Sequence, residues 1–349
     1  MHQSSGTPLS RFTTLRTGGP AKRLVEATTS DEVVTAVTAA DQAGEPVLIL
    51  GGGSNVVISD AGFEGTVVLL RSQGMHVTAD DAMAEVTVAA GERWDELVQI
   101  AVAESWSGVE ALSGIPGLVG GGPIQNIGAY GQQISTMISR VTVLDRQSGQ
   151  VRTMLPAQCH FNYRHSVFKG TDRYVVLDVT LVLEVSPTSQ PLGYAELADV
   201  LGAELGQRVP LAAVREAVLG LRRAKGMVLD LADPDSVSVG SFFTNVILDA
   251  ASFAELERRV GPNVELPRYP QPEGRMKVSA AWLIERAGFG KGYGTGPAGL
   301  STKHTLALIN RGNAKTKDVL GLARKIRDGV RERFGVELVP EPILVGVTL

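Results

Sequence analysis

The 349-residue chain has a single cysteine, little charge bias and no long apolar run. Because Cys159 stands alone, no internal disulfide can form. The formal net charge of −4 lacks the basic excess typical of nucleic-acid-binding proteins. No apolar run approaches the roughly 18 residues of a membrane span, and residues 1–8 have neither the basic region nor the apolar stretch of a secretion signal. These absences predict a cytoplasmic protein that binds neither membranes nor nucleic acids.

Histidine is also scarce. The five histidines, at positions 2, 76, 160, 165 and 304, show no metal-ligand spacing, so no metal site is expected. Cys159 precedes His160, which suggests a nucleophile pair. We expect both on a strand, where neighbouring side chains point to opposite faces, and this placement argues against mutual activation.

Glycine, by contrast, is abundant. It makes up 40 of the 349 residues, about 11% of the chain, whereas about 7% is usual. Many of these glycines gather at 51–53, 114–131 and 288–299. Clustered glycine indicates backbone that approaches a ligand closely. The length of the chain also exceeds what one small core can hold, which predicts two or three lobes.

Local patterns predict an α/β organisation for the first third. A capping serine followed by acids opens a helix over 30–43, and a glycine ends it. The apolar run 47–50 predicts a buried strand. Further strands are expected at 67–70 and 86–90, and a further helix at 95–104.

The rest of the chain mixes both element types. A hairpin is predicted over 140–145 and 151–155, and a long strand over 174–185. The turn-rich stretch 186–191 predicts a domain boundary. Beyond it, helices are expected over 211–225, 277–287 and 313–334, and a strand over 306–309. The basic residues of 313–334 could either contact a nucleic acid or simply face the solvent. Because no aromatic residues alternate with them and the chain is acidic, we expect a solvated face.

The first glycine cluster, Gly51-Gly52-Gly53-Ser54-Asn55, follows the strand 47–50 directly. Its backbone N–H groups and the serine hydroxyl suit a phosphate. As a dinucleotide fingerprint it is incomplete, because Val56 and Arg71 stand where a glycine and an acid are expected, and no P-loop lysine follows. By itself, the segment is either a phosphate cradle or a tight turn.

The second cluster, residues 112–131, contains no charged residue. Gln125, Asn126 and Tyr130 supply hydrogen-bonding groups within it. This composition is typical of a loop that wraps around a flat, partly polar cofactor.

Several further segments occur in one order along the chain: residues 13–20, 162–169, 240–245, 277–283 and 340–342, with Lys225 between them. Together with the two glycine clusters, they resemble the UDP-N-acetylenolpyruvoylglucosamine reductase family from about Leu15 to Val345. Members of that family depend on FAD and NADPH and act in cell-wall precursor synthesis.

The resemblance implies an α/β and α+β fold. It implies a two-lobed FAD-binding domain of the vanillyl-alcohol-oxidase/PCMH-like type at 11–185, completed by the helix 209–225 and the C-terminal strand 336–349. An α+β substrate-binding domain is expected at 226–335. FAD is expected to bind noncovalently, because residues 50–56 contain no histidine or cysteine. A monomer is expected.

The resemblance also implies site residues. The FAD contacts carried over are Gly51, Gly52, Gly53, Ser54, Asn55, Ile115, Pro116, Gly117, Gly121, Gly122, Ile124, Gln125, Asn126, Gly128 and Arg164. The substrate contacts are Tyr130, Tyr163, Tyr194, Lys225, Asn245 and His304. Tyr194 indicates the subtype in which a tyrosine loop closes over the sugar nucleotide.

Three catalytic residues are implied, and they are expected to converge over the flavin. Arg164 would stabilise the charge that grows on the enolpyruvyl carboxylate after hydride addition, Ser241 would protonate C2, and Glu341 would orient the arginine or share in stabilising the enol. Ile343 stands where the family pattern can carry an arginine, so a role for that cation is not expected here.

Two alternatives remain at this stage. The first is an FAD oxidase acting on a sugar or hydroxy acid, which would reduce O2 and ignore NADPH. The second is a redox-silent protein that binds a sugar nucleotide or a nucleic acid, which would take up no FAD.

Overall fold

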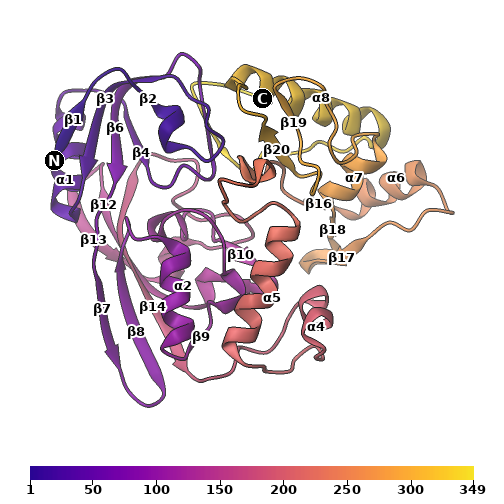
Figure 1. Ribbon diagram of the computed structural model, residues 1–349, viewed down its shortest axis with the longest axis horizontal. Coiled ribbons are helices and arrows are strands. Elements are labelled where there is room, and N and C mark those ends of the chain that lie inside the picture. The colour runs from indigo at the N-terminus through magenta and orange to yellow at the C-terminus, as the bar shows by residue number, and fades with distance from the viewer. The chain divides into compact units, whose positions relative to one another are not determined.

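The computed structural model describes residues 1–349, which form two compact units (Figure 1). The first unit contains Met1–Thr7, Pro20–Gly53 and Phe63–Ala224, and the second contains Pro8–Gly19, Ser54–Gly62 and Lys225–Leu349. The stretch 186–191, expected as a boundary, lies inside the first unit. None of the helices combines the length and apolar composition needed to cross a membrane.

The first sheet of the first unit is built on a β–α–β arrangement. Strands β3 (Pro20–Ala27) and β4 (Val47–Leu50) both pair in parallel with β6 (Phe63–Leu70), and helix α1 (Ser30–Gln42) connects them. At the start of α1, the backbone N–H of Glu32 donates to the Thr29 hydroxyl, a standard N-cap. The short strands β1 (His2–Ser4) and β2 (Thr7–Pro8) also pair with β3. The predictions of a helix at 30–43 and a strand at 47–50 are confirmed.

The second sheet of this unit is antiparallel, in the order β13-β12-β14-β8-β7, with β9 beside β14. Its strands are β7 (Met75–Ala79), β8 (Met83–Ala89), β9 (Trp106–Ser107), β12 (Ile138–Asp145), β13 (Gln150–Met154) and β14 (Tyr174–Val185). Figure 1 shows β7, β8 and β14 side by side in its lower part. The predicted hairpin and the predicted long strand are confirmed.

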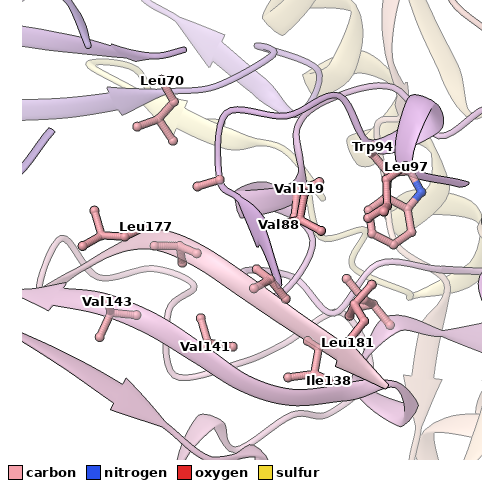
Figure 2. Packing of buried hydrophobic residues seen from close by; sticks show 14 of the residues in the cluster. Leu70, Val88, Trp94, Leu97, Val119, Ile138, Val141, Val143, Leu177 and Leu181 are labelled. Atoms are coloured by element: carbon pink, nitrogen blue, oxygen red, sulfur yellow. The ribbon is translucent and has the colours of Figure 1, made fainter. Parts of the chain in front are cut away.

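The core of the first unit lies against these sheets. Figure 2 shows Val88, Ile138 and Leu181, from three neighbouring strands, in the same cluster as Trp94 of helix α2 (Trp94–Ala103). The Trp94 ring is buried, and its Nε1 donates to the Leu112 carbonyl at 3.0 Å, so its one polar atom is satisfied. This bond ties α2 to the start of the second glycine cluster.

The remaining elements of the first unit are short strands and helices. They are η2 (Glu110–Leu112), η3 (Val119–Gly121), β10 (Gly128–Ala129), β11 (Gln132–Gln133), η4 (Ile134–Thr136), α3 (Pro156–Cys159), α4 (Ala195–Leu201) and α5 (Leu211–Ala224). The placement of Cys159 on a strand was wrong, because it ends the short helix α3, and His160 follows with φ of 48°.

The second unit contains three small sheets and three α-helices. Its elements are η1 (Leu9–Phe12), β5 (Val56–Ile58), η5 (Pro234–Ser236), β15 (Ser238–Ser241), β16 (Val246–Leu248), α6 (Ala250–Val260), β17 (Arg268–Pro270), η6 (Pro272–Gly274), β18 (Met276–Val278), α7 (Ala280–Arg286), β19 (Ala298–Leu300), β20 (Ala307–Asn310), α8 (Thr316–Phe334) and β21 (Ile343–Val345). The sheets are β15-β20-β19, β16-β18-β17 and the parallel pair β21-β5. The terminal strand therefore pairs with residues from the first sixth of the chain.

Helix α8 supplies much of the core of the second unit. Its apolar stripe, Val319, Ala323, Ile326, Val330 and Phe334, is buried, as its spacing predicts. The predicted helix 277–287 was partly wrong. Residues 276–278 form β18 between β16 and β17, and the helix begins only after Ser279, whose hydroxyl accepts from the Trp282 N–H at 3.3 Å.

Candidate active site

The two glycine clusters that the sequence singled out touch each other in the first unit. A Cβ on Gly52 would lie 2.8 Å from the Gly117 Cα, so the two backbones are in direct contact. The Gly117 carbonyl accepts from the Trp94 N–H at 3.1 Å, which ties this point of the loop to α2. Ser54 and Asn55, the last two residues of the first cluster, belong to the second unit.

Packing within the protein accounts for part of the glycine excess. A Cβ on the buried Gly122 would lie 2.7 Å from Ile134 Cδ1. The exposed Gly121 differs, because a Cβ there would have no atom within 4 Å. An open, exposed backbone within a loop that carries no charge fits a flat cofactor. The other expected contacts, Ile115, Pro116, Gly117, Ile124, Gln125 and Gly128, are half-buried.

The side-chain amide of Asn126 is hydrogen-bonded within the protein. It is 2% exposed, and its Oδ1 accepts from the Ser135 N–H at 3.1 Å. Its Nδ2 donates to the Asn162 carbonyl at 3.1 Å and to Gln133 Oε1 at 3.3 Å. A contact between Asn126 and FAD would therefore use its backbone.

Arg164 is held against the same loop. Its Nη2 donates to the Gly128 carbonyl at 2.7 Å and its Nη1 to the Asn126 carbonyl at 3.4 Å. The Tyr163 ring lies 5.7 Å from the guanidinium carbon, within range of a cation–π interaction. These contacts fix the orientation of the charged group.

Strained backbone gathers at the expected site. Seven non-glycine residues have positive φ, and three of them are expected site residues: Asn126 at 47°, Tyr130 at 46° and Arg164 at 51°. Such conformations are costly for residues with side chains and often cluster at functional sites. The other four, Arg16, Ser105, His160 and Glu273, are not expected site residues, so positive φ agrees with the expected site without defining it.

Tyr130 and Tyr194 lie beside each other in the first unit. Their rings pack edge to face, with centroids 5.5 Å apart and an interplanar angle of 87°. Burial raises the pKa of Tyr130 to about 12, with smaller contributions from Glu196 and Tyr194. Tyr194 is 42% exposed, so part of its side chain is accessible to solvent.

Sequence reasoning missed Arg222, a half-buried cation on α5. Burial lowers the pKa of Arg222 from its ordinary value, whereas the nearby Tyr130 and Asp95 raise it and Arg164 lowers it further. Arginine stays charged at neutral pH even so. The charge of Arg222 acts on Arg164 and Tyr130, so α5 contributes a second positive charge to the region of Arg164.

The seven-residue spacing of two arginines on α5 is a sequence pattern that could have pointed to Arg222. Arg215 stands seven positions before Arg222, so both lie on one face of the helix. Arg215 donates to both carboxylate oxygens of Asp95, at 2.8 and 3.0 Å. Asp95 also accepts from the Gly114 N–H at 2.6 Å, which connects α5 to the second glycine cluster.

Ser241 and Glu341 belong to neighbouring segments of the second unit. The Glu341 N–H donates to the Phe242 carbonyl at 2.9 Å, and Phe243 forms an antiparallel bridge with Pro340. Asn55 Nδ2 donates to the Glu341 carbonyl at 3.4 Å. The structure therefore brings together the segments of two expected catalytic residues and one expected FAD contact. Their convergence with Arg164 stays a prediction.

The other expected substrate contacts of the second unit have mixed surroundings. Asn245 Oδ1 accepts from the Ala280 N–H at 3.0 Å, so the oxygen of its amide caps α7. His304 lies in a turn, where its N–H donates to the Ser301 hydroxyl at 3.2 Å. Lys225 and His304 are both half-buried.

The third glycine cluster, 288–299, is held by Arg311. The Arg311 guanidinium donates to the carbonyls of Gly292, at 3.0 Å, of Gly296, at 3.3 Å, and of Gly294. A Cβ on Gly299 would lie 2.2 Å from the Arg311 Cζ. At Gly299 the guanidinium occupies the space where a Cβ would stand, whereas Gly288, Gly290 and Gly296 have open space around that position.

Comparison with known proteins gives matches over both parts of the chain. An FAD binding domain matches residues 21–154, and the C-terminal domain of UDP-N-acetylenolpyruvoylglucosamine reductase matches residues 233–345. A UDP-N-acetylenolpyruvoylglucosamine reductase of Thermobifida fusca (strain YX) is 56% identical over 347 residues, 98% of each chain. That of Streptomyces coelicolor is 54% identical over 98% of this chain and 90% of its own length. The chain belongs to the UDP-N-acetylenolpyruvoylglucosamine reductase family.

A solved structure from the same family agrees with this assignment. The crystal structure of UDP-N-acetylenolpyruvylglucosamine reductase from Thermus caldophilus matches with a TM-score of 0.66 and 26% identity, over 99% of both chains. The expected fold, an FAD-binding domain followed by a C-terminal α+β domain, is confirmed. The chain is an FAD-dependent oxidoreductase.

The residues of the first unit fit FAD. The backbone of Gly121 is open, and the loop around it is uncharged. Arg164 donates to the Gly128 carbonyl of the same loop, and its positive charge suits an anionic group. No cluster of histidine, cysteine or carboxylate side chains is arranged to hold a metal ion.

Proposed function

We propose that the chain reduces UDP-N-acetylglucosamine enolpyruvate to UDP-N-acetylmuramate, a step of peptidoglycan precursor synthesis, with NADPH as hydride donor. The observation that carries the proposal is 56% identity over 98% of the chain to a reductase named for this substrate. We further propose a cytoplasmic monomer with an FAD-binding domain at 11–185 and a substrate-binding domain at 226–335.

Arg164 is proposed to stabilise negative charge on the substrate. When bound and reduced by NADPH, the flavin would supply the hydride that C3 of the enolpyruvyl group receives. Charge then grows on the enolate formed by C2 and the carboxylate, and a fixed cation lowers the energy of that state. The bonds to the carbonyls of Asn126 and Gly128 support this role, because they hold the guanidinium in place before the charge appears.

Ser241 is proposed to donate the proton that C2 receives. A hydroxyl is a weak acid, and it can act here only because the enolate carbon is strongly basic. Ser241 follows Gly240, whose φ of 71° turns the strand at this point. The half-buried position of Ser241 at the end of β15 suits a hydroxyl presented to a ligand.

Glu341 is proposed to act beside the serine. The backbone bond from Glu341 to Phe242 and the bridge between Phe243 and Pro340 fix its segment next to residues 241–243. From this position its carboxyl group would orient the cation or share in stabilising the enol.

The remaining site residues are proposed to bind the two nucleotides. The FAD contacts are those of the two glycine clusters. Tyr130, Tyr163, Tyr194, Lys225, Asn245 and His304 are proposed to contact the substrate. The pair of Tyr130 and Tyr194 supports this assignment, because the two rings pack together edge to face and the positive charge of Arg222 acts on Tyr130.

The two half-reactions test the proposal separately. Anaerobic mixing of the holoenzyme with NADPH should bleach the flavin absorbance, and adding the enolpyruvyl substrate should restore it. In Ser241→Ala, bleaching should stay near the wild-type rate, while reoxidation by the substrate slows by on the order of 10²-fold or more. Equal loss of both steps would contradict the proton-donor role. A wild-type flavin that ignores NADPH and is reduced by a sugar or hydroxy acid would instead support an oxidase.

A further inference from the structure

Glu110 is a fully buried carboxylate in the middle of the first unit, and the proposed reaction does not use it. Its Oε2 accepts from the Gly108 N–H at 2.6 Å. Its Oε1 accepts from Gln132 Nε2 at 2.9 Å and from the Gln190 N–H at 2.8 Å. All three donors are neutral. A buried charge needs such hydrogen bonds to be tolerated, so this network holds its partners firmly.

The three donors come from two different segments. Gly108 and Gln132 lie in residues 107–136, here called the cofactor loop, which contains the second glycine cluster. Gln190 lies in residues 189–194, here called the tyrosine segment, which ends at Tyr194. One carboxylate oxygen therefore joins the two segments. Gln132 is itself oriented, because its Oε1 accepts from the Ala111 N–H at 2.8 Å.

Two neighbouring contacts keep the same segments aligned. The rings of Tyr130 and Tyr194 pack edge to face with centroids 5.5 Å apart. Between them, a Cβ on Gly131 would lie only 2.9 Å from the Gly193 carbonyl carbon, so the two backbones touch. Residues 130–132 thus run beside the tyrosine segment. Glu110 supplies a buried polar link between the two segments, and Gln190 Nε2 supplies another to Ser107 Oγ at 3.2 Å.

We propose that Glu110 is a positioning residue that couples the cofactor loop to the tyrosine segment. FAD that orders the cofactor loop also orders Tyr194 through this carboxylate. The coupling itself requires only FAD binding, which the family establishes. Its consequence for the substrate rests on the proposed function, in which Tyr194 contacts the sugar nucleotide.

Hydrogen exchange of the holoenzyme and of the same preparation stripped of FAD measures the coupling. In the wild type, FAD should slow exchange of the amides of residues 189–194 by on the order of tenfold. Glu110→Ala should abolish this dependence on FAD. Glu110→Gln should restore it, because its amide oxygen can still accept from Gln132 and Gln190. Asp145→Asn, which alters another buried carboxylate that contacts neither segment, should leave it unchanged.

A second pair of variants decides the question if Glu110→Ala does not fold. Both variants lose the Gln190 side chain, which donates to Ser107 Oγ at 3.2 Å and to Glu184 Oε2 at 2.8 Å. Gln190→Ala keeps the backbone donor to Glu110, whereas Gln190→Pro loses it and adds a ring that fixes φ. The coupling should be lost in Gln190→Pro and kept in Gln190→Ala. Wild-type dependence on FAD in Glu110→Ala, or in Gln190→Pro, would overturn the proposal.

Kinetics supply the readout that depends on the substrate. Holoenzyme carrying Glu110→Ala should show a KM for the enolpyruvyl substrate raised by on the order of tenfold, with flavin reduction by NADPH unchanged. Glu110→Gln should recover the wild-type KM. If the chain does not reduce this substrate, the kinetic arm fails while the exchange arm still decides the coupling.

Discussion

Replacing Gly52 by alanine tests whether contact between the two glycine clusters holds the FAD cradle together. The new Cβ would lie 2.8 Å from the Gly117 Cα and 3.3 Å from its carbonyl carbon. Both are backbone atoms, so no side chain can rotate away. The two segments must separate by roughly 0.7 Å to reach a normal carbon–carbon contact of about 3.5 Å.

The loss of unfolding free energy in Gly52→Ala can be estimated from comparable substitutions. Overpacking a well-packed region costs about 1–3 kcal/mol. We therefore expect the unfolding free energy of the FAD-free protein to fall by about that amount in Gly52→Ala. Because every 1.4 kcal/mol is about a tenfold change in affinity, a cradle displaced by this strain should bind FAD on the order of tenfold more weakly.

Urea unfolding and a fluorescence titration with FAD measure the two effects, and two glycines serve as controls. A Cβ on Gly121 meets no atom within 4 Å, so Gly121→Ala should keep its stability and lose only FAD affinity. Gly220 is exposed on α5 and also has open space, so Gly220→Ala should raise stability by about 0.5–1 kcal/mol.

Gly52→Ala with wild-type stability and wild-type FAD affinity would refute the contact argument. Unchanged FAD affinity in Gly121→Ala would remove residue 121 from the cradle, while the argument for Gly52 would stand.

Three further predictions concern single side chains. Arg311→Ala should lower the unfolding free energy in urea by about 1–2 kcal/mol, because the carbonyls of the loop 288–299 lose their donor, and Arg311→Lys should recover only part of it. Burial raises the pKa of Tyr130 to about 12, whereas an unfolded tyrosine titrates at about 10. Because the unfolded chain loses this proton first, the free energy of unfolding should decline between these two pH values, and Tyr130→Phe should flatten the decline. Burial raises the pKa of Cys159 to about 11, so an alkylating reagent at pH 8 should label only the unfolded chain; labelling of the folded protein would contradict this.

Elements with a strong local signal could be predicted from the sequence. The acids before residue 33 predict α1, although its cap is Thr29 and not the expected Ser30. The β-branched run at 174–185 predicts β14 over the same residues. Such signals depend on neighbours within a few positions, which the sequence displays directly.

Elements whose identity depends on distant partners could not be predicted in this way. Residues 276–278 form a strand because β16 and β17 pair on both sides of it, and helical spacing in the following residues concealed this. Cys159 was placed on a strand, yet the proline at 156 begins a four-residue helix there.

The residues of the candidate site also divide into those that the sequence predicts and those that depend on distant partners. Motif order identified the family, and it predicted the FAD loops and the catalytic residues. It gave no sign of Glu110, whose hydrogen-bond partners include Gln190, 80 positions away. For Arg222 it offered only the spacing from Arg215 on one helix face, while the charges that act on Arg222 lie mostly on other elements.

The sequence by itself determined which chemistry is available to this protein: two uncharged glycine-rich loops, an arginine, a serine and a glutamate in family order. Only the tertiary structure decided why many of the glycines are needed. Gly52, Gly122 and Gly299 leave room for Gly117, Ile134 and Arg311, whereas Gly121 stays open. The physical reason is that close packing is a property of atoms brought together from distant parts of the chain, and composition records only that small residues are present.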